Sequence, residues 1–229
     1  ADMSPMENFL IGVALGFERS QADTRFNSGE VESTGITVAP YLGVLFSEQL
    51  GASFDLSLDL SVGYTSTDID QFRTDPLSGN RITSRTDGDR WFLSSNIAAS
   101  RAFGDFFVAL RSGLLFARER QDAFTESNGT QVGESDASLG RFSVGAEVAY
   151  RIGTFEPYVS GYYEYDFQRE RVVTATAMQP ENDEDDVLFG LGLRWFPNES
   201  VSASVEYSTV LGRANFEART LQAVIRADF

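Results

Sequence analysis

One stretch constrains the fold of this chain more than any other. Residues 53–64 alternate strictly between two kinds of side chain: Phe54, Leu56, Leu58, Leu60, Val62 and Tyr64 against Ser53, Asp55, Ser57, Asp59, Ser61 and Gly63. Successive side chains of a β-strand point to opposite faces, so one face of this segment is apolar and the other carries serines and carboxylates. We expect the second face to contact water, because a strand buried on both faces has no place for two carboxylates.

The same alternation recurs along the chain and predicts ten strands. They cover residues 9–18, 36–46, 53–64, 91–99, 106–116, 141–151, 158–167, 187–195, 201–208 and 221–229. Helical periodicity is sustained nowhere, and no run of about 18 apolar residues predicts a transmembrane helix. Short turns near Gln49, Gly104, Gly153 and Asn198 alternate with five longer polar connections, at residues 21–33, 67–89, 121–136, 169–186 and 212–218.

This asymmetry is typical of a barrel in the bacterial outer membrane, where short periplasmic turns alternate with longer extracellular loops. Outward aromatic residues gather near the strand ends, as in the rings that flank the apolar band of such barrels. The sequence therefore predicts an all-β protein, a closed, antiparallel, up-and-down transmembrane β-barrel of about ten strands. Residues 1–229 would form a single domain with both termini on the periplasmic side. A soluble ligand-binding barrel is the alternative, and it predicts solubility without detergent.

Charged residues at the inward-facing positions of the strands predict a network that holds the inner wall together. Its members are Asp55, Asp59, Arg111, Arg141, Glu147, Glu164, Asp166, Arg194, Glu206, Arg226 and Asp228. Charges inside a lumen need opposite charges or water, and both signs are present. The apolar face of the last strand comprises Leu221, Ala223, Ile225, Ala227 and Phe229. This strand resembles the closing strand of outer-membrane barrels, whose terminal aromatic residue is recognised by the barrel-assembly machinery; the resemblance implies an assembly signal.

Two longer segments carry a more specific resemblance. RFSVGAEVAYRIGTFEPYVSGYYEYDF, residues 141–167, and VSASVEYSTVLGRANFEARTLQAVIRADF, residues 201–229, resemble the C-terminal half of autotransporter β-domains. The shared features are a Pro-Tyr-Val strand with alternating Tyr and Glu, a final Glu-Tyr hairpin, a loop with Gly and Arg, and the terminal Phe. Barrels of that family have twelve strands and carry a passenger upstream. Here the alternation gives ten strands, with about eight residues before the first.

Composition excludes several functions. The chain has a net charge of −16, no Cys and no His, and all 18 of its basic residues are Arg. It lacks the basic patch that nucleic-acid binding requires, and a Ser-His-Asp triad cannot be built. Paired carboxylates, Asp55 with Asp59 or Glu164 with Asp166, leave an acid–base mechanism formally open. The acidic loop with Asp183, Glu184, Asp185 and Asp186 is a weak candidate for Ca²⁺ or Mg²⁺, and a solvated loop tip is favoured.

We therefore expect a non-enzymatic outer-membrane protein without a cofactor, whose extracellular loops interact with the surroundings. Its expected partners are outer-membrane lipid, lipopolysaccharide and, during insertion, the assembly machinery; the sequence leaves the oligomeric state open. Two other roles remain. A narrow passive channel predicts stepwise conductance, although ten strands lie near the size at which side chains fill the interior. A translocator of autotransporter type predicts a passenger upstream of Ala1.

Overall fold

The computed structural model describes residues 2–6, 8–24, 28–46, 54–169, 184–198, 200–212 and 218–227. They form the strands β1 (Asp2–Met6), β2 (Phe9–Thr24), β3 (Gly29–Leu45), β4 (Asp55–Thr74), β5 (Arg81–Phe103), β6 (Phe106–Gln121), β7 (Phe124–Thr125), β8 (Gln131–Val132), β9 (Ser135–Tyr150), β10 (Phe155–Arg169), β11 (Asp185–Asn198), β12 (Val201–Leu211) and β13 (Arg219–Ala227). Among these residues, no helix is long and apolar enough to cross a membrane.

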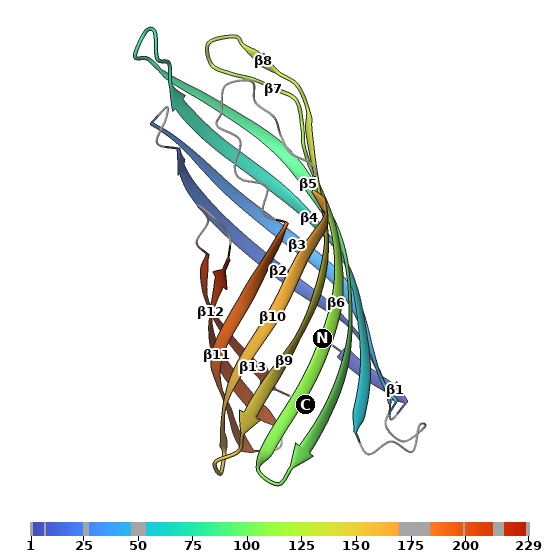
Figure 1. The fold of residues 1–229 in the computed structure, drawn as a ribbon. Coiled ribbons are helices and arrows are strands. Elements are labelled where there is room, and N and C mark those ends of the chain that lie inside the picture. Colours follow the sequence, from blue (N-terminus) through green and yellow to red (C-terminus); the bar gives the residue numbers. More distant parts are fainter. Residues whose placement is uncertain are drawn as a thin grey trace.

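Eleven of the strands form one antiparallel sheet in chain order, and β7 and β8 form a separate hairpin. The sheet curves strongly, so that it has a concave inner face and a convex outer face (Figure 1). The outer face is apolar: Leu15, Phe17, Leu110, Leu191 and Ile225 are among its most exposed side chains. Tyr64 packs against Trp91, and Phe106 against Tyr150, each pair with ring centroids 4.7 Å apart. An apolar outer face with aromatic pairs suits a surface in contact with lipid.

The prediction of a closed barrel of about ten strands is corrected by the structure. The sheet has eleven strands in a half-barrel, and its edge strands β1 and β13 share no ladder within the described residues. The additional strand is β1, which pairs with β2 through Asp2 opposite Gly12 and Met6 opposite Phe9. Five residues that include Pro5 are too few to display alternation. Alternation within a strand also cannot show whether the two edges of a sheet meet, because closure depends on shear and strand tilt.

Two predicted polar connections are largely strand. Residues 67–89 form the upper part of the β4–β5 hairpin, in which Asp68 opposes Asp87 and Thr74 opposes Arg81. The connection at 21–33 contains the ends of β2 and β3, which pair from Asp23 with Glu30 to Thr24 with Gly29. Strands β4 and β5 have 20 and 23 residues, whereas a membrane crossing needs only about 9–11. These hairpins are therefore longer than a membrane crossing requires, and they project at one end of the sheet (Figure 1).

The short turns lie at the opposite end of the sheet, as predicted. Gly104 joins β5 to β6 with a φ of 62°, and Gly153 joins β9 to β10 with a φ of 59°. Both conformations are left-handed and favour glycine. The turn near Asn198 lies between β11 and β12. The predicted turn near Gln49 lies outside the described residues.

Candidate functional site

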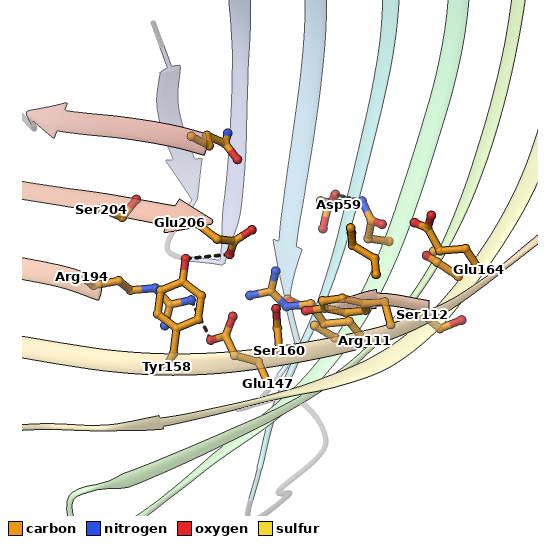
Figure 2. Close-up of a pocket in the computed structure, with 18 residues that line it drawn as sticks. Asp59, Arg111, Ser112, Glu147, Tyr158, Ser160, Glu164, Arg194, Ser204 and Glu206 are labelled. Atoms are coloured by element: carbon orange, nitrogen blue, oxygen red, sulfur yellow. Dashed lines mark hydrogen bonds and ion pairs between the residues drawn. The ribbon is translucent and has the colours of Figure 1, made fainter. Parts of the chain in front are cut away.

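A cavity of about 630 Å³ lies on the inner face, and the side chains that line it come from strands between β4 and β13. Four carboxylates line it, Asp59, Glu147, Glu164 and Glu206, together with the arginines Arg111 and Arg194. Figure 2 shows these side chains projecting from several strands into the same space. The lining also includes serines, tyrosines and the amides of Asn96 and Gln222. The inner face is therefore polar, as the alternation predicts.

Arg194 of β11 joins this strand to the two strands that precede it in the sheet, β9 and β10. Its guanidinium donates to Glu147 on β9 at 2.7 Å and to Glu156 on β10 at 2.9 Å. It also lies over the ring of Tyr158, 4.1 Å from the centroid, and the Tyr158 hydroxyl donates to Glu206 on β12 at 2.7 Å. Glu147 is only 3% exposed, so its charge depends on Arg194 for compensation.

Arg141 of β9 organises a second group further toward the long hairpins. Its Nε donates to Asp166 Oδ1 at 2.6 Å, and its Nη1 donates to Glu164 Oε2 at 2.6 Å. Asp186 of β11 is buried directly opposite Glu164 in the β10–β11 ladder. Three carboxylates and one guanidinium thus share a small region of the inner wall. The structure brings together the predicted residues Arg141, Glu164 and Asp166.

A third group was not predicted. Arg90 of β5 donates to Glu119 on β6 at 2.9 Å and to Glu18 on β2 at 3.2 Å. Because β2 and β5 are separated by two strands, this contact crosses the concavity of the sheet. Glu18 occupies an inward-facing position in its strand, so the alternation of side chains could have predicted its place on the inner wall. The same holds for Glu156, which lies two residues before Tyr158 and therefore faces the same side of the sheet.

Glycines on the inner face leave room for aromatic rings that lie flat against the wall. A Cβ on Gly63 would come within 2.0 Å of the Phe92 ring, which lies opposite it in the ladder. A Cβ on Gly192 would meet the ring of Tyr158 at 2.3 Å, and one on Gly145 would meet Tyr162 at 2.5 Å. The ring of Tyr158 therefore reaches both Arg194 and Glu206 because Gly192 has no side chain.

The other predicted network members are not joined to an arginine in the same way. Asp59 accepts from Asn96 Nδ2 at 2.7 Å, and Asp55 is exposed opposite Ser100 at the end of β4. Arg111 is exposed to the cavity. Arg226 lies on β13, opposite Ser202. Asp228 lies outside the described residues.

The predicted acidic loop is partly strand, which corrects that interpretation. Asp185 and Asp186 begin β11, where alternation places them on opposite faces. Asp185 accepts from the Tyr163 hydroxyl at 3.3 Å, and Glu184 accepts from that of Tyr165 at 3.5 Å, whereas Asp186 is buried opposite Glu164. Asp183 lies outside the described residues. In the described part of the chain, no group of three or more acidic side chains, including the group around Arg141, has an arrangement that could hold a metal ion.

The predicted assembly signal lies on the edge strand β13. Leu221 and Ile225 are 74% and 81% exposed on the outer face, and Ala223 and Ala227 share their parity. Phe229 lies outside the described residues. The role of this strand in assembly stays a prediction.

Outside the membrane-spanning part, the segment between β6 and β9 is fastened to the β4–β5 hairpin. Arg73 donates to both carboxylate oxygens of Glu126, at 2.8 and 2.7 Å. The Ser127 amide donates to the Thr83 carbonyl at 2.9 Å, and the Ser127 hydroxyl accepts from the Thr83 amide at 3.0 Å. The hydrogen bond from Arg73 lowers the pKa of the Glu126 carboxyl below its usual value. The two hairpins therefore form one connected extension above the sheet.

Comparison with known proteins agrees with this architecture. A family model described as an autotransporter beta-domain matches residues 1–208. No curated protein matches the chain. Among solved structures, the translocator domain of autotransporter NalP from Neisseria meningitidis has a TM-score of 0.78 at 17% identity, covering 100% of this chain and 78% of that one. The beta domain of the Bordetella autotransporter BrkA has a TM-score of 0.67 at 19% identity, covering 100% and 86%. The transport unit of AIDA-I from Escherichia coli has a TM-score of 0.70 at 12% identity, covering 100% and 79%. At these identities the similarity to solved structures is one of fold.

Proposed function

Because the chain belongs to the autotransporter β-domain family and is an outer-membrane protein of β-barrel type, we propose that it acts as a translocator. In this role its inner face accommodates an extended polypeptide segment on its way through the membrane. The protein performs no chemical reaction on that segment. The solved structures with this fold include a translocator domain and a transport unit, which supports the proposal.

The observation that carries the proposal is the 630 Å³ polar cavity on the concave face. An extended peptide exposes its backbone N–H and C=O groups, and these groups need hydrogen-bond partners or water throughout a membrane. Serines, amides and paired charges supply such partners. Fixed ion pairs such as Arg194–Glu147 leave the wall polar without a large uncompensated charge.

A reporter domain fused upstream of Ala1 tests the proposal in bacteria, with antibody labelling of intact cells as the measurement. Ser204→Trp places a large side chain in the cavity, and Val205→Trp places the same side chain on the outer face of the same strand. We expect Ser204→Trp to reduce labelling and Val205→Trp to leave it unchanged. Both variants must keep the heat-modifiable gel migration of a folded barrel. Equal labelling of the reporter in both variants contradicts the proposal, and so does its absence in the parent.

A surface-interaction role is the second candidate, and the connected hairpins favour it. The segment between β6 and β9 is held against the β4–β5 hairpin by the Arg73–Glu126 pair on β4 and by the paired hydrogen bonds of Ser127 with Thr83 on β5. At the tip of the β4–β5 hairpin, the side chain of Leu77 is 96% exposed. Deleting residues 75–80 and joining the strands with a two-residue turn tests this role. Cell-surface adhesion or lipopolysaccharide binding should fall while reporter display persists.

A further inference from the structure

We infer that Arg111 binds a carboxylate carried by the polypeptide segment that occupies the cavity. This inference rests on the proposed translocator function and adds the chemistry of one contact. Arg111 extends from β6 into the cavity, where its side chain is exposed. Within the described residues, it has no ion pair, whereas Arg141 and Arg194 each bind two carboxylates.

The acids around Arg111 already have donors. Glu147 accepts from Arg194 at 2.7 Å, and Glu164 accepts from Arg141 at 2.6 Å. Asp59 and Glu206 accept from Asn96 and Tyr158, each at 2.7 Å. All four carboxylates that line the cavity are therefore held by other side chains. Arg111 is left as a permanently charged group facing open space.

The chemistry of the guanidinium group selects the ligand. It is planar, stays protonated and presents N–H donors in a fork that matches the two oxygens of a carboxylate. Hydrogen bonds of this type are shorter and stronger than those between neutral groups. A segment with a Glu or Asp side chain at the level of Arg111 would complete the network, and the same segment with Gln or Asn would not.

Side-chain labelling of the whole folded protein in detergent tests the inference. Phenylglyoxal modifies accessible arginines, and mass spectrometry of the digested protein reads each arginine separately. We expect rapid modification at Arg111 and slow modification at Arg141 and Arg194. A blocked Gly/Ser peptide carrying one Glu should slow the reaction at Arg111, and the matched peptide carrying one Gln should not. The outer residue Arg118, on the same strand, should react equally with and without either peptide.

Two variants complete the design, with fluorescence anisotropy of the labelled Glu peptide as the readout. Arg111→Gln should weaken binding by about tenfold or more, since hydrogen bonds to charged groups contribute roughly 1.5–3 kcal/mol. Arg118→Gln makes the same charge change on the outer face of β6 and should leave binding unchanged. Equal protection of Arg111 by both peptides, or no protection by either, overturns the inference. If the reporter still reaches the surface in that case, the proposed function stands without this contact; loss of display in the parent protein removes the proposed function itself.

Discussion

Arg194 shows how a single side chain can join several strands of the inner wall. It contacts Glu147 on β9, Glu156 on β10 and the ring of Tyr158, and Tyr158 extends the connection to Glu206 on β12. Burial removes Glu147 and Glu156 from most of the water, since their side chains are 4% and 12% exposed. Removing one partner from such a pair leaves the other charge uncompensated.

We therefore expect Arg194→Met to lower the free energy of unfolding by about 3 kcal/mol or more. The measurement is urea unfolding in detergent micelles, followed by tryptophan fluorescence. Arg118→Gln is the control, because the Arg118–Asp136 pair lies on the exposed outer face and such pairs contribute less than about 1 kcal/mol. Similar losses in the two variants would contradict the structural role of Arg194.

Gly63 makes a different residue-scale prediction. A Cβ at this position would lie 2.0 Å from the Phe92 ring, so the ring or the backbone must move. We expect Gly63→Ala to destabilise the protein by about 1–3 kcal/mol, the usual cost of overpacking. Gly161→Ala is the matched control within a strand, because a Cβ there meets nothing within 4 Å. Combining Gly63→Ala with Phe92→Ala should remove part of the penalty; if the two losses simply add, the contact is not its cause.

At the scale of elements, the contact between the long hairpins depends on the negative charge of the Glu126 carboxylate, which protonation removes in acid. The pKa of Glu126 is lowered in the folded state by its hydrogen bond from Arg73. A group with a depressed pKa stabilises the fold above its unfolded pKa, near 4.5, and this contribution disappears as the pH falls through the lower, folded value. Docking of the β7–β8 segment onto β5 should therefore weaken only below about pH 4.5.

Hydrogen exchange at the Ser127 amide measures this docking, since that amide donates to Thr83. We expect the protection factor, corrected for the intrinsic exchange rate, to be constant near neutral pH and to fall in acid. Glu126→Gln should show low protection at all pH values. A variant that retained the acid-induced loss would place the titrating group elsewhere.

At the scale of the whole molecule, the two ends of the sheet differ in a way that predicts orientation. The β4–β5 hairpin projects at one end of the sheet, whereas the β5–β6 and β9–β10 turns lie at the other end (Figure 1). These two turns are tight and contain Gly104 and Gly153. We expect an epitope inserted after Leu77 to bind antibody on intact cells. The same epitope inserted between Gly104 and Asp105 should bind only after the outer membrane is permeabilised. The reverse pattern would invert the orientation and place the short turns outside.

The alternation of apolar and polar side chains determined, from the sequence alone, where the strands lie and which of their faces points inward. Residues 53–64 specify a strand with an apolar and a polar face because the period of a strand is two residues, and the same rule placed Arg141, Glu147, Glu164, Asp166 and Arg194 on the inner wall. Period and turn spacing also identified ten strands of the main sheet. These properties are local, so the sequence contains them directly.

Tertiary structure alone decided which charges meet. Alternation along the strands assigns Arg111 and Arg194 to the same face of the sheet. Strand register and the curvature of the wall then bring two carboxylates to Arg194 and leave Arg111 exposed in the cavity. The contact of Arg90 with Glu18 spans strands that are not neighbours, and the open edges of the eleven-stranded sheet depend on its overall curvature. Register, shear and curvature arise from the packing of all strands together, which the pattern along any one strand does not contain.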